Sequence, residues 1–282
     1  MVEIREALTQ ASQSLQRENV DSPRLDAEVL LAHVLDTNRA KVLAWPDRQL
    51  TPKQLTQYRN LINRRARREP LAYILGHREF YGLDLVVDPR VLVPRPETEV
   101  LVEEALRMAH QFKEPLRIAD VGAGSGAIAV ALATHLPEAV VYALDASPGA
   151  LEITAANAQR HGVSHRVHCL QGHLLAPLPE SVHLITANLP YVAAGEWEAL
   201  APEIREYEPR DALVGGEDGL ELIRDLLATA APHLKPGGGI LLEIGASQGT
   251  QAMAAASGHF PGAQLALRQD YAGLDRVLVV KT

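Results

Sequence analysis

This chain of 282 residues has a single cysteine, no long apolar run and no excess of positive charge. The single cysteine, Cys169, excludes an internal disulfide and a cysteine-rich zinc site. Its setting, "RVHCLQG", predicts an interior strand, so we expect a buried and unreactive thiol. Such sparing use of cysteine is typical of a reducing compartment, and we expect a cytoplasmic protein.

The absence of long apolar runs bears on membranes and export. No segment approaches the ~20 uninterrupted apolar residues that a membrane-spanning helix needs. The stretch "MVEIREALTQ" places charges where a signal peptide needs an apolar core. We therefore expect neither a membrane span nor a signal peptide.

The formal net charge is −8 at pH 7. This balance argues against non-specific nucleic-acid binding, because neutralising phosphates needs Lys and Arg. The 11 histidines show no paired spacing with cysteine or carboxylates, so no metal site is predicted.

The chain length suits two domains, and a hydrophobic content of 47% allows a sizeable core. Residues 1–75 predict a small helical bundle without strands, in which one helix begins with Thr51 as its N-cap and Pro52 in its first turn. Aromatic and β-branched residues cluster in 76–96 around glycine and proline, which predicts a β-hairpin linker.

From residue 97 to 282 strands alternate with helices. The strand patterns are "LRIADVG", "AVVYALDAS", "RVHCLQG", "VHLITANLP" and "ILLEIG", and "KPGGG" predicts the stop of the helix before the last of them. The ending "AQLALRQDYAGLDRVLVVK" predicts two strands in a hairpin. This alternation predicts an α/β fold with a mainly parallel sheet covered by helices on both faces.

A glycine-rich loop, "DVGAGSGA", joins the first of these strands to a helix and contains Gly122, Gly124 and Gly126. Glycines at this point make a tight turn and let backbone approach a ligand. Ala127 satisfies the looser dinucleotide fingerprint, so the loop by itself leaves NAD open. A tight turn without any ligand is an equally good reading of the loop alone.

The next strand ends at Asp145, roughly 20 residues beyond the glycine loop, where an acidic side chain bonds ribose hydroxyls. A helix N-cap is the structural alternative, but Ser147 already suits that position. The glycine loop and Asp145 together favour an adenosine-containing ligand.

The stretch "LITANLPYVA" ends an apolar strand on Asn188, Leu189, Pro190 and Tyr191. The Asn188 side-chain oxygen and the Leu189 carbonyl are acceptors, Pro190 keeps Leu189 extended, and Tyr191 offers a face for stacking. Two acceptors and a platform suit a planar –NH2 group, whose lone pair would then point out of plane toward a methyl donor. Asn188 is no base near neutral pH, so the proton is expected to leave late. A plain turn is the alternative.

These residues resemble a known family. "VLVPRPETE", "DVGAGSGAIAVALA", "ALDAS" and "NLPY", after a helical segment ending in "EPLAYILGHREFYG", resemble the release factor glutamine methyltransferases over essentially the whole chain. The resemblance implies a class I methyltransferase, Rossmann-like, with a seven-stranded sheet and a C-terminal antiparallel hairpin over 97–282. It also implies a helical substrate-binding domain over 1–75 and a hairpin linker over 76–96.

The family resemblance implies a reaction as well. S-adenosyl-L-methionine would donate a methyl group to the side-chain amide nitrogen (N5) of the glutamine in the Gly-Gly-Gln motif of class 1 peptide chain release factors. We expect a monomer that binds no nucleic acid directly.

The resemblance also assigns site residues. The catalytic clamp would be Asn188, Leu189, Pro190 and Tyr191, with Leu189 in place of the family's usual proline. Cofactor-binding residues would be Gly122, Ala123, Gly124, Ser125, Gly126, Asp145, His173 and Asn188. His173 stands where the family usually has an aspartate near the adenine, and an exposed loop histidine is a competing reading. "VPRPETE" is expected to line the same pocket.

Three other functions can be weighed against this one. An adenine-N6 methyltransferase acting on rRNA or DNA needs the same clamp, but it lacks this N-terminal domain and usually carries a basic surface. A non-catalytic module should have lost Asn188, and an NAD-dependent dehydrogenase has no use for the clamp. The arginine run from Arg64 to Arg68 predicts a solvated helix face or, alternatively, a contact with an acidic release-factor surface.

Overall fold

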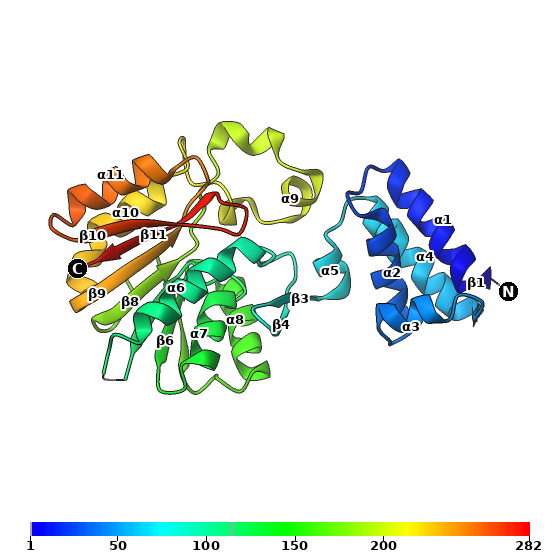
Figure 1. Cartoon of the computed structure of the whole chain (residues 1–282), viewed down its shortest axis with the longest axis horizontal. Helices are drawn as coiled ribbons and strands as arrows, with labels where there is room; N and C mark the ends of the chain where they lie inside the picture. The colour runs from blue at the N-terminus through cyan, green and yellow to red at the C-terminus, as the bar shows by residue number, and fades with distance from the viewer. Residues whose placement is uncertain (1, 114) are drawn as a thin grey trace. The chain divides into compact units, whose positions relative to one another are not determined.

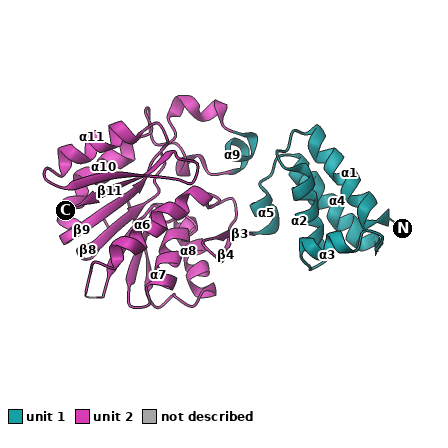
Figure 2. Cartoon of the chain, in the orientation of Figure 1, with its two compact units in different colours: residues 1–76, 201–207 teal, residues 77–200, 208–282 magenta. Residues whose placement is uncertain are grey.

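The computed structural model describes residues 2–113 and 115–282. The chain forms two compact units, shown in separate colours in Figure 2. Unit 1 comprises residues 1–76 together with 201–207, and unit 2 comprises 77–200 and 208–282.

Unit 1 is a helical bundle with a leucine-rich core (Figure 1). The prediction that Thr51 is a helix N-cap is confirmed at the start of α4. Thr51 Oγ1 accepts a hydrogen bond from the Gln54 amide, and the Gln54 side chain accepts one from the Thr51 amide. This reciprocal pair satisfies two donors that the helix start would otherwise leave free. The helices of unit 1 are α1 (Ile4–Arg17), α2 (Pro23–Val34), α3 (Arg39–Ala44), α4 (Pro52–Ala66), α5 (Leu71–Leu75) and α9 (Pro202–Tyr207).

The prediction of a strand-free bundle was wrong. Two short strands, β1 (Val2–Glu3) and β2 (Gln49–Leu50), pair antiparallel in unit 1. They pin the start of α1 to the turn before α4, and they bury Leu50. Strands of two residues carry no alternation that a sequence pattern could reveal.

Helix α9 joins the bundle although more than a hundred residues separate it from α4. Glu203 accepts hydrogen bonds from Arg65 (3.1 Å) and Arg68 (2.5 Å). Arg65 also donates to Asp26 at 2.7 Å, and it is only 6% exposed. The prediction that the arginine run is a solvated helix face is therefore wrong for Arg65, which lies buried between two carboxylates.

Unit 2 is built around a seven-stranded sheet (Figure 1). The strands lie in the order β10-β11-β9-β8-β5-β6-β7, with only the β11 pairings antiparallel. This arrangement confirms the predicted fold class, including the C-terminal antiparallel hairpin. The strands are β5 (Arg117–Val121), β6 (Val140–Asp145), β7 (Val167–Gln171), β8 (Val182–Ala187), β9 (Leu234–Glu243), β10 (Gln264–Gln269) and β11 (Asp275–Lys281).

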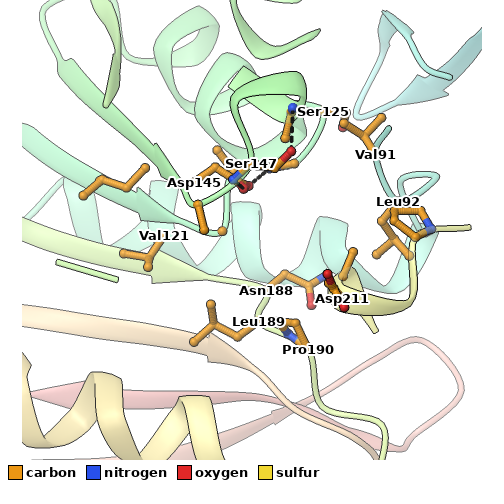
Figure 3. Close-up of a pocket in the computed structure, with 18 of the residues that line it drawn as sticks. Val91, Leu92, Val121, Ser125, Asp145, Ser147, Asn188, Leu189, Pro190 and Asp211 are labelled. Atoms are coloured by element: carbon orange, nitrogen blue, oxygen red, sulfur yellow. Dashed lines mark hydrogen bonds between the residues drawn. The ribbon is translucent and has the colours of Figure 1, made fainter. Parts of the chain in front are cut away.

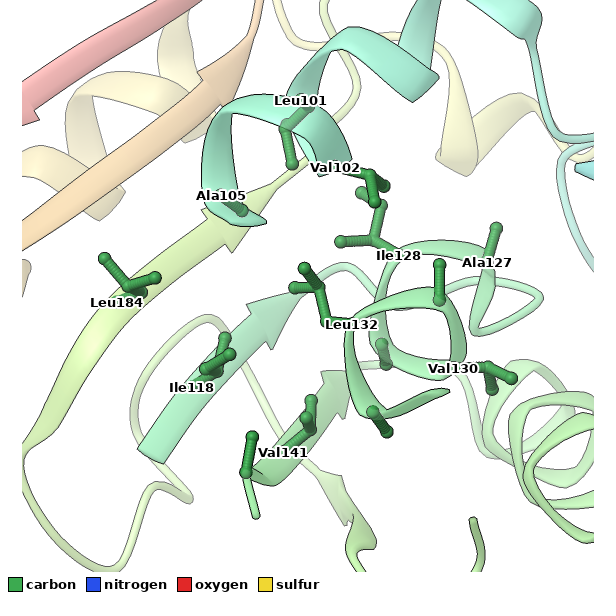
Figure 4. Close-up of a cluster of buried hydrophobic side chains, with 14 of the residues drawn as sticks. Leu101, Val102, Ala105, Ile118, Ala127, Ile128, Val130, Leu132, Val141 and Leu184 are labelled. Carbon is green, nitrogen blue, oxygen red and sulfur yellow. The ribbon is translucent and has the colours of Figure 1, made fainter. Parts of the chain in front are cut away.

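Helices cover both faces of this sheet. Adjacent strand residues alternate between two cores, so that Leu184 packs on one face and Ile185 on the other. Figure 4 shows the first core, where residues of α6 and α7 meet Ile118, Val141 and Leu184. The long helices of unit 2 are α6 (Glu99–Ala109), α7 (Ala127–His135), α8 (Pro148–Arg160), α10 (Glu221–Ala230) and α11 (Gly249–His259).

The hairpin and the connections complete unit 2. Strands β3 (His77–Phe80) and β4 (Leu83–Val86) pair antiparallel, and Phe80 and Leu85 are buried in the α6–α7 core. Short 3-10 turns fill several connections, namely η1 (Pro96–Thr98), η2 (Ala194–Ala199), η3 (Arg210–Ala212) and η4 (Ala231–His233).

Two sequence predictions in unit 2 were wrong. The helix before "KPGGG" does end ahead of it, but the next strand begins earlier than the pattern "ILLEIG" predicted, because "KPGGG" lies inside β9, which begins at Leu234. Gly239 in this stretch leaves room for Met108, since a Cβ on Gly239 would lie 2.3 Å from the Met108 side chain. Cys169 is not on an interior strand, because β7 is the edge of the sheet and the thiol is only partly buried.

The chain order creates a crevice at one edge of the sheet. After β5 the chain builds β6 and β7 on one side and then returns to place β8 on the other side of β5. Ligands of open α/β sheets bind beyond the carboxyl ends of the strands at such a reversal point. The glycine loop follows β5, Asp145 ends β6 and Asn188 follows β8, so all three meet there.

Candidate active site

A cavity of about 440 Å³ opens at this edge and lies wholly within unit 2. Its size falls in the usual range for small-molecule sites. Figure 3 shows Asp145 and Ser147 on one side of it and Asn188 to Pro190 on the other. Its walls come from residues in 90–98, 121–128, 144–150, 172–174, 188–190 and 209–212, and from Leu222.

The three glycines of the loop have positive φ angles of 74°, 55° and 78° at Gly122, Gly124 and Gly126, but they serve different neighbours. A Cβ on Gly122 would lie 3.1 Å from Leu189 Cδ2, so the lack of a side chain at Gly122 lets Leu189 of the clamp pack close to the loop. A Cβ on Gly126 would lie 2.9 Å from Thr154 Cγ2, so the lack of a side chain at Gly126 lets helix α8 pack close to the loop. Gly122 and Gly124 line the cavity together with Ala123 and Ser125, and Gly126 is not among its lining residues.

Asp145 lines the cavity with its carboxylate held by two backbone amides. Oδ2 accepts a hydrogen bond from Gly124 N at 2.9 Å, and Oδ1 accepts one from Ser147 N at 2.8 Å. Ser147 Oγ in turn accepts from Ala150 N at 3.2 Å, which makes Ser147 the N-cap of α8 as predicted. Each carboxylate oxygen keeps a second lone pair, so Asp145 can still accept from a diol.

Asp120 lies behind the loop and is fully buried. Burial raises the pKa of its carboxyl to about 7, against the opposing effect of hydrogen bonds from the Thr186 hydroxyl and the Ala129 amide. The side chain thus fastens the start of α7 to β8 and takes no place in the cavity wall. Its role is to support the loop.

The clamp predicted from "NLPY" is only partly in the cavity. Asn188, Leu189 and Pro190 line it, whereas Tyr191 is not among the lining residues. The Tyr191 hydroxyl donates to Glu243 Oε1 at 3.2 Å, and burial raises the pKa of Tyr191 well above its ordinary value. The stacking role of Tyr191 therefore stays a prediction.

The segment "VPRPETE" contributes to the cavity wall through Pro94, Arg95 and Thr98. Glu208 holds this segment in place, because its carboxylate accepts from Val93 N at 3.2 Å and from Arg95 Nη2 at 2.5 Å. The ion pair with the buried Glu208 and the hydrogen bond from Val93 N fix this part of the cavity wall.

His173 has an exposed side chain and also lines the cavity. Its position thus fits both an exposed loop histidine and a residue near the cofactor, and its contact with adenine stays a prediction. The next residue, Leu174, has a positive φ of 46°, which marks a tight turn in this wall.

Sequence reasoning missed two contacts of the clamp residues. Asn188 Nδ2 donates to Thr98 Oγ1 at 3.2 Å, and Tyr191 donates to Glu243, which is 1% exposed. A signal for Glu243 existed in "ILLEIG", where a carboxylate interrupts an apolar strand. Thr98 belongs to the segment that was expected to line the pocket, but its contact with Asn188 was not predictable, because it joins two elements that are far apart in the sequence.

Comparison with known proteins identifies chains that are similar to this one. A family model described as PrmC N-terminal domain matches residues 6–76, and one described as Methyltransferase domain matches residues 118–207. Release factor glutamine methyltransferase of Geobacter sulfurreducens is 46% identical over 246 residues, which cover 87% of this chain and 85% of that protein. Its counterpart in Moorella thermoacetica is 44% identical, with 97% and 96% of the two chains covered.

The chain belongs to the release factor glutamine methyltransferase family. The alignment with the Moorella thermoacetica protein covers 97% of this chain, and the PrmC N-terminal domain model matches residues 6–76, so the family relation includes the helical unit. A solved methyltransferase from Pyrococcus furiosus shares the fold, with a TM-score of 0.53, 18% identity, and 78% of this chain and 98% of that chain covered.

The described residues lack two other kinds of feature. In residues 2–113 and 115–282, every helix is too short or too polar to traverse a lipid bilayer. The same residues hold no group of three or more His, Cys, Asp or Glu side chains arranged to bind a metal ion.

Proposed function

We propose that this enzyme transfers a methyl group from S-adenosylmethionine to N5 of the glutamine in the Gly-Gly-Gln motif of class 1 peptide chain release factors. Its membership in the release factor glutamine methyltransferase family supports this activity. The observation that carries the proposal is that one cavity is lined by the glycine loop and Asp145 on one side and by Asn188 on the other.

The cofactor half of the cavity suits S-adenosylmethionine, which supplies an electrophilic methyl group when bound. The loop from Gly122 to Ser125 would hold the methionine part, and Asp145 would accept hydrogen bonds from the ribose hydroxyls. His173 would lie at the adenine edge. The mixture of apolar wall and few polar groups fits a ligand that has no pyrophosphate.

The substrate half would hold the glutamine amide. Asn188 Oδ1 and the Leu189 carbonyl would each accept one N–H, so that the nitrogen lone pair faces the methyl donor. A leucine side chain in place of proline leaves the carbonyl available, because Leu189 points its side chain at Gly122. The N–H proton would leave after the nitrogen has become cationic.

Several finer points are part of the same proposal. Residues 1–75 would bind the release factor outside its Gly-Gly-Gln loop, and the match of residues 6–76 to the family's N-terminal domain supports this. We further propose a monomeric, cytoplasmic enzyme without direct nucleic-acid contacts. The net charge of −8 and the family's release-factor substrates are consistent with these points.

The decisive experiment is mass spectrometry of release-factor Gly-Gly-Gln peptides after incubation of the whole release factor with enzyme and S-adenosylmethionine. We expect a single added methyl on the glutamine, and none without enzyme. Parallel reactions with rRNA and DNA test the adenine-N6 alternative. Methyl transfer to nucleic acid alone would contradict the proposal, and retention of NAD on purification would favour a dehydrogenase.

A further inference from the structure

The buried face of helix α8 carries two polar side chains that hold the glycine loop. Thr154 and Asn157 are three residues apart, so they share one face of the helix, and each is 0% exposed. Thr154 Oγ1 donates a hydrogen bond to Gly124 O at 3.0 Å, and Asn157 Nδ2 donates one to Ser125 O at 2.8 Å. Two successive carbonyls of the loop are therefore fixed to α8.

Asn157 also binds the end of the β3–β4 hairpin. Its Oδ1 accepts a hydrogen bond from Val86 N at 2.7 Å, and its Nδ2 donates one to Val86 O at 3.0 Å. This reciprocal pair imitates the bonds of a neighbouring strand and satisfies the backbone of the last residue of β4. One carboxamide thus makes three hydrogen bonds to two segments that are far apart in the sequence.

Both of these segments belong to unit 2 and lead into the cavity wall. Ser125 lines the cavity itself, and the chain that leaves Val86 lines it with residues 90–92. Figure 3 shows Ser125 and Val91 in this wall. Asn157 is not among the lining residues, so its effect on a ligand must pass through the backbone that it holds.

The sharing of one side chain matters more than the number of bonds. Each segment could satisfy its backbone groups through a separate side chain, and the two segments could then shift independently. With Asn157 between them, neither Ser125 nor Val86 can move relative to the other without breaking a buried hydrogen bond. Such a break leaves a polar group unsatisfied in the interior, which costs stability.

We infer that Asn157 is a positioning residue that fixes the glycine loop to the wall segment 90–92 and thereby couples cofactor binding to the order of the β3–β4 hairpin. This inference rests on the proposed cofactor site and on no particular methyl acceptor. A ligand that contacts both parts of the wall favours the arrangement in which the Asn157 bonds are made. By linkage, the same bonds must then strengthen the binding of that ligand.

Hydrogen exchange of the wild-type full chain gives the first test. The Val86 amide is held by Asn157 Oδ1, so its exchange rate reports on this bond, although Val86 does not line the cavity. Saturating S-adenosylhomocysteine should slow exchange at Val86 by about threefold or more. Protection of the glycine loop with unchanged exchange at Val86 would overturn the inference.

Asn157→Ala removes all three bonds. The Kd for S-adenosylhomocysteine should rise about tenfold, and the ligand should no longer slow exchange over residues 86–92. At saturating S-adenosylmethionine, kcat on whole release factor should stay within about threefold of the wild type. The loss should therefore appear in KM for the cofactor, whereas the loss of a catalytic group would appear in kcat.

Two variants at the same end of the helix serve as controls. His161 Nε2 donates to Asp84 O at 3.0 Å, so this histidine ties the end of α8 to β4 and not to the glycine loop. His161→Ala should speed exchange in β4 and leave the Kd for S-adenosylhomocysteine within about threefold of the wild type. Gln159→Ala removes an exposed carboxamide from α8 and should change neither quantity.

The outcomes separate the inference from the proposed function. Wild-type affinity in Asn157→Ala, or an equal loss of affinity in His161→Ala, would overturn the inference and leave the proposed function standing. If Asn157→Ala does not fold, the exchange of the wild-type Val86 amide still decides. A wild-type protein that binds no S-adenosylhomocysteine would instead overturn the proposed cofactor site, and the inference with it.

Discussion

At the scale of single residues, the clamp depends on one carboxamide. Asn188 is the only clamp side chain that offers a polar acceptor to the cavity, since Leu189 contributes its carbonyl and Pro190 has no polar side-chain atom. In the proposed mechanism the amide has no acid–base role, so its contribution would be orientation and charge stabilisation. A large part of the rate would then depend on a group that stays neutral throughout.

Replacing Asn188 with alanine should therefore abolish most of the rate while leaving the cofactor site intact. We expect kcat to fall by about a hundredfold or more, as when an oxyanion donor is removed. Binding of S-adenosylhomocysteine, measured by calorimetry, should change by less than about threefold, because the loop and Asp145 remain. A variant with wild-type kcat would contradict the clamp mechanism.

Asp120 makes a prediction about stability. Its folded pKa of about 7 lies above the ordinary value of about 3.9. Its contribution to stability is thus full below about pH 4 and is lost as the pH rises through about pH 7. The free energy of unfolding of the wild type, relative to Asp120→Asn, should drop by about 2 kcal/mol between about pH 5 and about pH 8.

Denaturant titrations of both proteins at the two pH values measure this difference. Asparagine can keep one of the two hydrogen bonds from Thr186 and Ala129, so the variant should fold. A difference in unfolding free energy that does not change with pH would show that the Asp120 carboxyl stays ionised when buried.

At the scale of elements, the glycine loop and its neighbours were partly predictable. The pattern around Gly122 correctly predicted a strand, a tight turn and a helix, because glycine spacing and apolar periodicity are local. That Gly126 makes room for Thr154 on α8, and Gly122 for Leu189, was not predictable, because contacts between distant elements leave no local pattern. The missing side chains of Gly122 and Gly126 therefore allow Leu189 and helix α8 to pack against the loop that lines the cavity.

Gly126→Ala should destabilise the protein more than Gly162→Ala. Both positions have positive φ, which costs alanine about 1 kcal/mol. A Cβ at Gly162 meets nothing within 4 Å, whereas one at Gly126 meets the Thr154 side chain at 2.9 Å. The additional cost at Gly126 should be about 1–3 kcal/mol of unfolding free energy, measured by denaturation. Equal losses in the two variants would mean that α8 moves away freely.

The misses at this scale have physical causes. The two-residue strands β1 and β2 are too short to show alternation, and the glycines of "KPGGG" are typical of a break although they lie inside β9. The contacts of Asn188 with Thr98 and of Tyr191 with Glu243 join separate elements. Local propensity contains none of this information, whereas the positions of Asp145 and Asn188 at strand ends followed from strand periodicity alone.

At the scale of the whole molecule, unit 1 is assembled from two separate parts of the chain. Glu203 of α9 bonds Arg65 and Arg68, and its pKa is lowered because these arginines outweigh the effect of burial. A lowered pKa means that this stabilisation is present at neutral pH and is lost as the pH falls through the folded value.

Glu203→Ala should reduce the stability of unit 1 by about 1–3 kcal/mol, because Arg65 stays buried with only Asp26 as an acidic partner. The matched control is Glu206→Ala on the same helix, whose exposed carboxylate should contribute less than about 0.5 kcal/mol. Hydrogen exchange of the α2 and α4 amides in the full chain measures both. Equal protection in the two variants would show that α9 contributes nothing to the bundle.

The split composition of unit 1 limits how this enzyme can be recombined with its relatives. A chimera that exchanges only residues 1–76 would set a foreign helical surface against the native Glu203. Substitutions in residues 1–76 that alter the surface around Arg65 and Arg68 must therefore be matched by substitutions in 201–207, during evolution or in engineering. An exchange that carries 201–207 along with 1–76 should yield folded protein far more often than one that does not.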